Sequence, residues 1–526
     1  MSIRVYLWLK MALPDVIEIV PLDKPVRAEI TVPGSKSITN RALILAALAD
    51  GEVTLTGALW SEDTQIMVEC LQKLGFEIRV ENDPAEFCNR NITVRGLGGT
   101  ILPQGGTGTI EKPRELFVGN AGTAARFLSA FVCLGDGVYR LSGVPRMHER
   151  PQAALFQALR ELGYRVESEN GNDKLPVRIY GRDAVSASQN VSKKVRGGDT
   201  PSLPKKCRVS IEESSQFASA LLLCAKVGNW EVEVVGENAE ESPYVAMTSK
   251  LMEAFPNNGG VFQIEPDASS GSYFWAAGLI TGSIQMDLPY LPPSKPNISS
   301  NWTNIAKNIF VKCWPNTGWQ IDERFEEFRL VGSLLHDFQT ISKRLGELEK
   351  LGKGDEEKVR TVIGPEVINS SKGEVSRCRD LGDSIMTAIA VAPVTHWAGK
   401  RGFIKFTDLG RLRVQESERV VALRTELTKC GAKVVEEGDT LTVWPSPLHG
   451  AEIETYNDHR MAMCFAILGL KVPGIKIENP ACVKKTFPNF FQKLAAAPPR
   501  GLGAEIWGIK DGQRTRKLSG EDLFAD

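Results

Sequence analysis

Three segments of this 526-residue chain repeat one local pattern: an amphipathic helix, a glycine and a short alternating strand. They read QKLGFEIRV at 72–80, RELGYRVES at 160–168 and TKCGAKVVE at 428–436. Glycine just past a helix end is favoured because it adopts a left-handed backbone without steric strain. The three copies predict an α/β protein built from duplicated units, and their uneven spacing excludes a solenoid of equal repeats.

Composition limits the class of protein. With 42% hydrophobic and 24% charged residues, the chain has the make-up of a soluble globular protein, and its length predicts at least two domains. Lys and Arg number 63 against 64 Asp and Glu, so no overall basic field would recruit nucleic acid. No apolar run is long enough to span a membrane. We expect no nucleic-acid or membrane partner.

The cysteines and the start of the chain indicate a cytoplasmic protein. Ten cysteines are scattered without a CxxC pair, and several lie in apolar helical runs, which favours reduced thiols. The first residues, MSIRVYLWLKMALPD, read as a strand or frayed terminus rather than a signal peptide. No His/Cys ligand cluster appears, so we expect neither metal nor cofactor.

A glycine-rich turn opens one apolar helix. Residues 116–127 read LFVGNAGTAARF, with Gly119 and Gly122 on either side of Asn120 and Ala121. Backbone N–H groups at such a helix start can bind an anion. An ordinary turn explains the stretch equally well, and from these residues alone the two interpretations are about even.

Other helix starts also carry cations, hydroxyls or acids. Lys36 and Arg41 lie at the start of a helix, where positive charge is unfavourable unless an anion is held there. Asp383 precedes an apolar helix, and by itself is best read as a helix cap. Further starts of this kind contain Arg146, Arg150, Ser214, Ser215, Gln216, Arg413, Glu416, Arg419, Asp458, His459, Arg460, Lys484 and Lys485. A solvated helix end explains each singly, but their number favours a binding site for anions.

Seven motifs together resemble one family. They are PGSKSITNRALILAALADG, LFVGNAGTAARFLSA, PRMHERP, SSQFASALLL, EPDASSGSYFWAA, TYNDHRMAM and KTFPNFF, in family order over about 20–285 and 360–495. The chain resembles the 3-phosphoshikimate 1-carboxyvinyltransferase (5-enolpyruvylshikimate-3-phosphate synthase) family, most closely the enolpyruvyl transferase part of the fungal arom polypeptide. The wording of SSQF and PRMHERP disfavours the related transferase that acts on UDP-N-acetylglucosamine.

The resemblance implies the two-domain enolpyruvyl transferase fold, an inverse α/β barrel in which each domain has three βαβαββ units and the domains close over the substrates. Residues 1–35 would be a strand and linker joining the second domain. The first globular domain would span 36–265, and the second 266–495 with a divergent segment at 288–360. The C-terminal tail, 496–526, has a proline pair and mixed charge, and we expect it to be disordered.

The implied reaction joins the 5-hydroxyl of shikimate 3-phosphate to C2 of phosphoenolpyruvate: the methylene carbon is protonated, a tetrahedral intermediate forms and phosphate leaves. Only these two small molecules are expected as partners of a monomeric protein. By motif position, phosphoenolpyruvate would be held by Lys36, Gly122, Arg150, Gln216, Arg419, Arg460 and Lys485. The phosphate and carboxylate of the shikimate would be held by Lys36, Ser37, Arg41, Ser214 and Ser215.

The remaining roles also follow from the resemblance. Asp383 would accept a proton and Glu416 would carry one, with Lys36 and His459 completing the catalytic set. Further substrate-binding candidates are Asn120, Thr123, Tyr244 and Gln415. Gly122 would have no side chain because a β-carbon would crowd the ligand.

Three positions depart from the family pattern. Gln415 stands where the family has lysine, Arg411 where it has asparagine, and Glu241 where a phosphate-binding serine is expected, with Ser242 one place away. Losing the lysine charge beside Asp383 predicts a raised pKa for that aspartate.

Three hypotheses follow. The first is a transferase of the shikimate pathway. The second is a divergent relative that acts on another cyclic acid or phosphate. The third is a catalytically silent binding protein, which the intact phosphoenolpyruvate motifs disfavour. The number of intact motifs favours the first.

Overall fold

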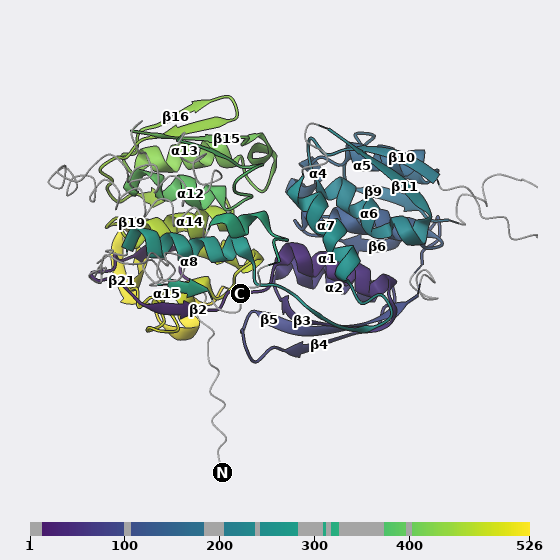
Figure 1. Ribbon diagram of the computed structural model, residues 1–526, viewed down its shortest axis with the longest axis horizontal. Helices are drawn as coiled ribbons and strands as arrows, with labels where there is room; N and C mark the ends of the chain where they lie inside the picture. Colours follow the sequence, from purple (N-terminus) through teal and green to yellow (C-terminus); the bar gives the residue numbers. More distant parts are fainter. Residues whose placement is uncertain are drawn as a thin grey trace, which may run out of the picture. The chain divides into compact units, whose positions relative to one another are not determined.

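The computed structural model describes residues 13–98, 107–182, 205–236, 242–281, 309–311, 317–325, 373–395 and 402–525. The chain divides into two compact units (Figure 1). Unit 1 contains the described residues within 1–32, 268–314 and 321–526, and unit 2 those within 33–267 and 315–320.

Unit 2 contains two four-stranded sheets of one design, with strand orders β6-β7-β9-β8 and β12-β3-β5-β4, and a parallel pair β10-β11. In both larger sheets the first pair is parallel and the other pairs are antiparallel. The strands are β3 (Asp50–Leu59), β4 (Ile78–Asn82), β5 (Asn89–Leu97), β6 (Arg114–Phe117), β7 (Val138–Ser142), β8 (Arg165–Ser168), β9 (Val177–Tyr180), β10 (Lys205–Ser210), β11 (Trp230–Val235) and β12 (Gly260–Gln263). The helices are α1 (Lys36–Leu48), α2 (Glu62–Lys73), α3 (Gly122–Phe131), η1 (Val132–Leu134), α4 (Pro145–Glu149), α5 (Ala153–Glu161), α6 (Gln216–Gly228) and α7 (Pro243–Ala254).

Unit 1 repeats the design in its sheet β14-β15-β17-β16, beside a five-stranded sheet β18-β19-β1-β20-β21 and a parallel pair β13-β2. The strands are β1 (Val16–Ile19), β2 (Ala28–Ile30), β13 (Ile309–Val311), β14 (Glu374–Ser376), β15 (Ile404–Thr407), β16 (Val434–Glu437), β17 (Thr440–Val443), β18 (Glu452–Ile453), β19 (Ile475–Glu478), β20 (Ile506–Lys510) and β21 (Gln513–Lys517). The helices are α8 (Ala268–Thr281), η4 (Ile321–Glu323), α12 (Ile385–Val391), η6 (Ala392–Val394), η8 (Gly410–Val414), α13 (Arg419–Lys429), α14 (His459–Gly469), η9 (Pro480–Lys485), α15 (Phe490–Ala495) and η10 (Gly520–Leu523).

The three predicted helix–glycine–strand repeats are confirmed. Gly75, Gly163 and Gly431 follow α2, α5 and α13 and have φ of 95°, 85° and 89°, a region that side chains with a β-carbon rarely adopt. Each glycine leads into the edge strand of a four-stranded sheet, namely β4, β8 or β16. Apart from the short helices η1, α4, η6 and η8, the order β6-α3-β7-α5-β8-β9 is one βαβαββ unit, and β14-α12-β15-α13-β16-β17 is another.

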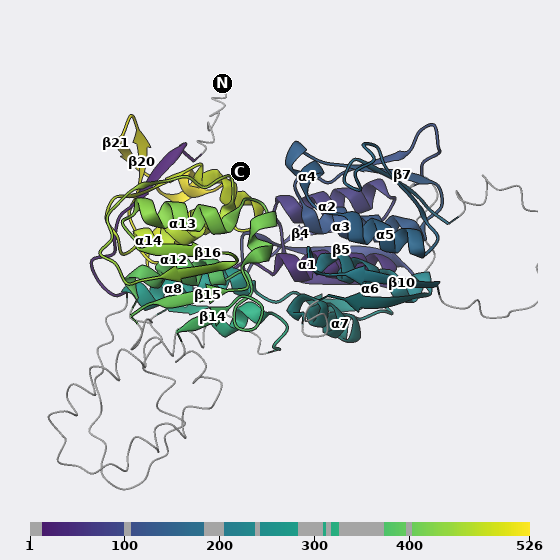
Figure 2. The same cartoon turned by 90° about the horizontal axis from the view of Figure 1, so that it is seen from above.

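Each unit is built around three central helices: α1, α3 and α6 in unit 2, and α8, α12 and α14 in unit 1. Nearly all residues of α3, α12 and α14 and most residues of α1 and α8 are buried, as expected for helices that are apolar on all sides, whereas about half of the residues of α6 are buried. Figures 1 and 2 show α12 and α14 in the interior of unit 1, with the sheet of β14–β17 on one side and that of β1, β20 and β21 on the other. Sheets therefore enclose helices, as the inverse barrel requires.

The prediction of a disordered C-terminal tail is wrong. Residues 506–517 form β20 and β21, which extend the five-stranded sheet, and β20 pairs along its length with β1. Arg514 donates two hydrogen bonds of 2.8 Å to the Glu18 carboxylate, so charge also ties the end of the chain to β1. The apolar stretch that contains Ile506 and Ile509 is short, and its partner strand β1 lies at the opposite end of the sequence.

Two predictions fall largely outside the described residues. These are the strand or frayed start, of which 1–12 are not described, and the divergent segment at 288–360, of which only 309–311 and 317–325 are described. Within that segment, Ile309–Val311 forms β13 and Ile321–Glu323 forms the 3₁₀ turn η4.

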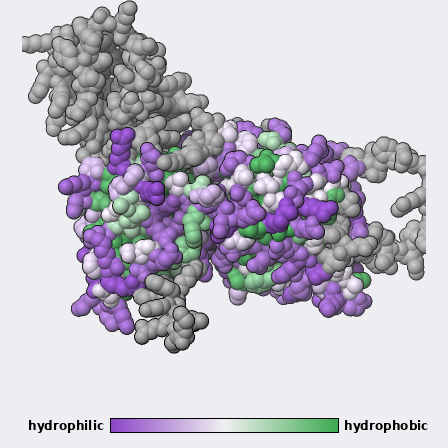
Figure 3. Space-filling view, turned by 90° about the horizontal axis from the view of Figure 1, so that it is seen from below, coloured by the Kyte–Doolittle hydropathy of each residue, from purple (hydrophilic) through white to green (hydrophobic). Residues whose placement is uncertain are grey.

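On the face drawn in Figure 3, hydrophilic residues cover most of the described area and hydrophobic residues form scattered patches. Within the described ranges, every helix is too short or too polar to cross a bilayer. None of the nine cysteines in those ranges forms a disulfide, and all except Cys378 are buried.

Candidate functional site

The start of α1 in unit 2 carries Lys36, whose ammonium group lies 3.0 Å from the Asp63 carboxylate of α2. Asp63 is buried, and the sequence analysis did not select it. The carboxylate compensates a cation that would otherwise oppose the dipole of α1. The nearest signal in the sequence was the acidic first turn of α2, which a helix start explains equally well.

Arg41 lies one turn further along α1 and is 1% exposed. Its guanidinium donates to the Thr248 hydroxyl at 2.8 Å, the Ser219 hydroxyl at 3.0 Å and the Ser37 carbonyl at 2.9 Å. Its carbon stands 5.2 Å from the centre of the Phe127 ring. Burial lowers the pKa of Arg41 to about 10, because neutral partners stabilise the cation less than water does.

The GNAGT turn holds an arginine. Gly119 has φ of 53°, and α3 begins at Gly122. Arg150 donates from Nη1 to the Asn120 carbonyl at 3.2 Å. A β-carbon on Gly122 would lie 2.7 Å from Arg150 Nη2. Among the described residues, the group that such a β-carbon would crowd is therefore Arg150, and the crowding of a ligand at Gly122 stays a prediction.

Gln216 links two of the central helices of unit 2. Its carbonyl accepts from Arg126 Nη1 at 2.6 Å, and its amide donates to the Thr123 hydroxyl at 3.3 Å. Ser214 Oγ accepts from the Gln216 backbone N–H at 3.3 Å, while Ser215 is the N-cap residue of α6. The starts of α3 and α6 are thus joined through side chains that the motifs placed there.

The start of α7 follows Glu241, one of the three positions that depart from the family pattern. Glu241 lies outside the described residues. Ser242 is the N-cap of α7, and its buried hydroxyl has no hydrogen-bond partner among the described residues. Tyr244 follows in the first turn, and its carbonyl accepts from Thr248 at 2.8 Å. The Ser242 hydroxyl at this helix start is suited to binding an anion, although the family pattern places the serine one position earlier, at Glu241.

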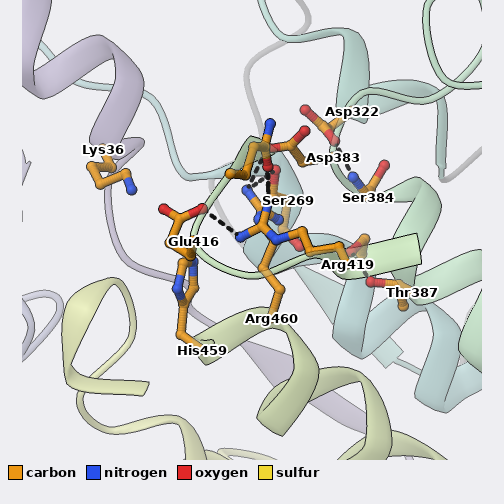
Figure 4. Close-up of polar contacts among 12 residues, drawn as sticks. Lys36, Ser269, Asp322, Asp383, Ser384, Thr387, Glu416, Arg419, His459 and Arg460 are labelled. Carbon is orange, nitrogen blue, oxygen red and sulfur yellow. Dashed lines mark hydrogen bonds and ion pairs between the residues drawn. The ribbon is translucent and has the colours of Figure 1, made fainter. Parts of the chain in front are cut away.

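In unit 1, Arg419 at the start of α13 is the centre of an ionic network (Figure 4). It lies 2.7 Å from the Asp458 carboxylate and 2.9 Å from that of Glu416, and Glu416 also pairs with Lys485 at 3.0 Å. Burial lowers the pKa of Arg419, but Asp458 and Glu416 outweigh burial and raise it. These cations are therefore already neutralised in part by the protein.

Asp383 faces three guanidiniums. Its Oδ1 accepts from Arg377 Nη2 at 2.6 Å, while its Oδ2 lies 3.5 Å from Arg460 Nη2 and 3.9 Å from Arg419 Nη1. Burial raises the pKa of Asp383, but the three arginines outweigh burial and hold it well below its usual range. The predicted rise in its pKa is therefore wrong, because Arg377 supplies a charge that the sequence analysis did not consider.

The helix-cap interpretation of Asp383 is also wrong: the N-cap of α12 is Ser384, and the Asp383 side chain bonds to Arg377 instead. Asp322 supports this turn from η4, where its Oδ1 accepts from the Ser384 backbone N–H at 2.6 Å. A β-carbon on Gly382 would lie 2.7 Å from Asp322 Oδ2, so the close approach requires glycine. Burial and the charge of Asp383 raise the pKa of Asp322.

The start of α14 brings Asp458, His459 and Arg460 to this cluster. Asp458 caps the helix by accepting from the Arg460 backbone N–H at 3.0 Å. Arg460 also donates to the Ser269 hydroxyl of α8 at 3.3 Å, and His459 Nδ1 lies 3.8 Å from Asp458. The central helices α8, α12 and α14 therefore direct their first turns to one place in unit 1.

The segment before α13 contains one residue with a structural role, Arg413, and one that belongs to the cluster, Gln415. Arg413 pairs with Glu418, Glu436 and Asp439, which assigns it to the packing of this region. The Gln415 carbonyl accepts from Arg419 Nη1. Gln415 therefore supplies a hydrogen-bond acceptor to the cluster and no charge.

The cluster in unit 1 combines groups that bind anions with groups that exchange protons. Arg419, Arg460 and Lys485 can hold phosphate or carboxylate groups, while Asp383 and Glu416 can accept or deliver protons. In the part of the chain that the structure describes, no three His, Cys, Asp or Glu side chains are grouped to hold a metal ion. The sequence analysis missed Arg377 and Asp322, because both lie outside the motifs and each reaches the cluster only through folding.

Comparisons with known proteins agree with this architecture. A family model for EPSP synthase (3-phosphoshikimate 1-carboxyvinyltransferase) matches residues 21–294 and 335–494. The 3-phosphoshikimate 1-carboxyvinyltransferase of Trichormus variabilis is 35% identical over 500 residues, covering 91% of this chain and 98% of the relative. That of Opitutus terrae is 34% identical over 519 residues, covering 94% and 100%.

Two solved structures share the fold. The EPSP synthase from Acinetobacter baumannii has a TM-score of 0.54 at 20% identity, covering 93% of this chain and 99% of its own. The enolpyruvyl transferase NikO from Streptomyces tendae has a TM-score of 0.53 at 13% identity, covering 93% and 98%. Together, the motifs, the repeated sheets and these matches show that the chain belongs to the EPSP synthase family.

Proposed function

We propose that this protein transfers the enolpyruvyl group of phosphoenolpyruvate to the 5-hydroxyl of shikimate 3-phosphate and releases phosphate, a step of aromatic amino acid biosynthesis. The observation that carries the proposal is the cluster of Asp383 and Glu416 among Arg419, Arg460 and Lys485, in a member of this family. The reaction needs an acid, a base and cations for several anionic groups, and the cluster contains all three kinds.

The proton transfers are assigned to the two carboxylates. Asp383 takes the proton of the 5-hydroxyl of shikimate 3-phosphate. The oxygen of that hydroxyl then bonds to C2 of phosphoenolpyruvate, while C3 receives a proton carried by Glu416. Loss of phosphate and of the added C3 proton from the tetrahedral intermediate then gives the enolpyruvyl ether. The contact of Glu416 with Lys485 at 3.0 Å supports its role, since a neighbouring ammonium can exchange protons with it.

The anionic groups of the substrates are assigned to the cations at the predicted motif positions. Arg150, Arg419, Arg460 and Lys485 bind phosphoenolpyruvate, together with the backbone of the GNAGT turn. Lys36, Arg41 and the hydroxyls of Ser37, Ser214 and Ser215 bind shikimate 3-phosphate. The buried hydroxyl of Ser242 is a further hydrogen-bond donor. It supports a phosphate site at the start of α7, in which Ser242 takes the role of the serine expected one position earlier.

A different acceptor is the alternative, and Gln415 is the observation that favours it. This side chain accepts from Arg419 and brings no charge to the acceptor region. A cyclic acid or phosphate with fewer negative groups than shikimate 3-phosphate would match that loss. A silent binding protein is less favoured, because every carboxylate and cation of the proposed chemistry is present.

The test measures phosphate release from phosphoenolpyruvate with shikimate 3-phosphate, and identifies the enolpyruvyl product by mass spectrometry. Appearance of that product supports the proposal. Folded protein that gives no product with shikimate 3-phosphate, but releases phosphate with another cyclic acceptor, would replace it with the alternative. We also propose that the protein works as a monomer and that it is cytoplasmic; the lack of disulfides among its described cysteines supports the location.

A further inference from the structure

Asp383 is surrounded by charges from four elements. Arg377 follows β14, Arg419 begins α13, Arg460 lies in α14, and the Asp322 carboxylate approaches from η4. In Figure 4, Asp383 lies between Asp322 and the guanidiniums of Arg419 and Arg460. Of the three arginines, Arg377 makes the shortest contact, at 2.6 Å, and its side chain is only 6% exposed.

The three arginines differ in what substrate binding does to them. In the proposed function, Arg419 and Arg460 bind the anionic groups of phosphoenolpyruvate, so their charges are neutralised when the substrate arrives. The negative charge of the bound phosphoenolpyruvate and the burial of Asp383 then both favour the protonated form of this aspartate. A base that is protonated before the reaction cannot accept the proton of the hydroxyl.

We propose that Arg377 is the positioning residue that keeps Asp383 ionised and correctly oriented when substrates are bound. Its Nη2 binds Oδ1, which leaves Oδ2 as the atom available to the acceptor hydroxyl. Because the proposed function assigns Arg377 to no substrate group, its charge stays with Asp383 throughout the reaction. This inference rests on the proposed function for the identity of the base, and adds a residue that none of the motifs contains.

The test compares pH profiles of kcat for the wild-type protein, Arg377→Gln and Arg377→Lys. The acid limb of the profile reports protonation of the base in the substrate complex. Removing an opposite charge within hydrogen-bond distance should shift that limb upward by about one to three pH units in Arg377→Gln. Activity should therefore fall most below neutral pH and recover towards alkaline pH, and lysine should restore part of the wild-type profile.

Arg379→Gln is the matched control. Arg379 lies two residues away with a side chain that is 69% exposed, and its contact to Glu374 is 3.8 Å, so its removal should leave the profile unchanged. A uniform loss of kcat at every pH in Arg377→Gln would indicate a merely structural role and overturn the inference. An unchanged acid limb would also overturn it.

A second measurement does not depend on turnover. The carboxyl ¹³C signal of Asp383 in aspartate-labelled protein, assigned with Asp383→Asn, can be titrated in the wild type and in Arg377→Gln. A higher titration midpoint in the variant supports the link between Arg377 and Asp383 even if shikimate 3-phosphate is not the acceptor, and thus separates the two proposals. Equal midpoints in the two proteins would overturn the inference, whatever the activity.

Discussion

Arg41 of unit 2 and Arg419 of unit 1 are both 1% exposed, yet their surroundings are opposite. Arg41 donates to two hydroxyls and a carbonyl, whereas Arg419 contacts the carboxylates of Asp458 and Glu416. Accordingly, burial lowers the pKa of Arg41 to about 10, while the pKa of Arg419 is raised by its carboxylate partners despite burial.

The difference shows two ways of preparing an anion site. Neutral partners complete the hydrogen bonds of a guanidinium but leave its charge uncompensated, so a substrate anion gains the full attraction. Carboxylate partners compensate the charge in advance, so a substrate must replace them. Arg150 resembles Arg41, because it donates to the Asn120 carbonyl and pairs with no carboxylate of the described residues. We infer that Arg41 and Arg150 of unit 2 attract anions directly, whereas Arg419 of unit 1, like Lys36 with Asp63, exchanges a carboxylate partner when a substrate binds.

Asp458→Asn should have the largest effect on stability. It removes the charge partner of a fully buried guanidinium, which costs about 3–5 kcal/mol in comparable proteins. Urea-induced unfolding would measure the loss. Asp439→Asn is the control, because Asp439 is 60% exposed where it pairs with Arg413, and a change below about 1 kcal/mol is expected. Equal effects of the two substitutions would contradict the dependence of Arg419 on its carboxylates.

Arg150→Ala should weaken phosphoenolpyruvate binding at least tenfold, since a charge-assisted contact contributes about 1.5–3 kcal/mol. Calorimetric titration gives the affinity. Arg146→Ala, one turn earlier in a half-exposed pair with Glu149, should bind phosphoenolpyruvate like the wild type. Unchanged affinity in Arg150→Ala would remove this arginine from the site.

Gln415→Lys tests whether shikimate 3-phosphate is the acceptor substrate. If shikimate 3-phosphate is the substrate, the added charge should raise kcat/KM for it by about tenfold, or about 1.4 kcal/mol. The gain is limited because the lysine would lie near Arg419, which now donates to Gln415. If Arg411 replaces the missing lysine, Arg411→Asn should reduce activity more in the wild-type protein than in the Gln415→Lys variant, which a double-mutant cycle would reveal. Absent activity on shikimate 3-phosphate in all these proteins would exclude it as acceptor.

Gly122→Ala should raise KM for phosphoenolpyruvate about fivefold, or about 1 kcal/mol, because the new β-carbon displaces the Arg150 guanidinium. Its thermal stability should hardly change, since alanine suits a helix and a flexible side chain can move. Gly119→Ala should behave in the opposite way: φ of 53° and the nearby Ile66 side chain predict lower stability. Lost stability in Gly122→Ala with normal kinetics would support the ordinary-turn interpretation.

Arg41→Met should change stability least, by less than about 1 kcal/mol, because replacing a buried charge with an apolar side chain is often neutral or favourable. Ser219 and Thr248 keep a mutual hydrogen bond of 2.9 Å after its removal. Thermal unfolding should also show less stabilisation by inorganic phosphate than in the wild type. A loss as large as that of Asp458→Asn would mean that Arg41 has a compensating partner after all.

The local architecture was predictable from the sequence. The helix–glycine–strand repeats, with their amphipathic helices, and the apolar central helices depend on periodicity and on the backbone preferences of a few neighbouring residues. The motifs likewise put the right chemical groups at the helix starts, since each motif contains both the helix and its first turn. Such patterns can be read from the sequence because the interactions that cause them join residues close together in the chain.

The electrostatic state of each group was decided only by the tertiary structure. Arg41 finds its hydroxyl partner Thr248 across 207 positions, and Ser384 its partner Asp322 across 62. Arg377 is near Asp383 in sequence, but only the folded turn directs its guanidinium to Oδ1 and reverses the expected pKa shift. The C-terminal strands gain order from β1, with Arg514 reaching Glu18 across 496 positions. A charge responds to every charge that folding brings near it, and those neighbours come from distant parts of the chain.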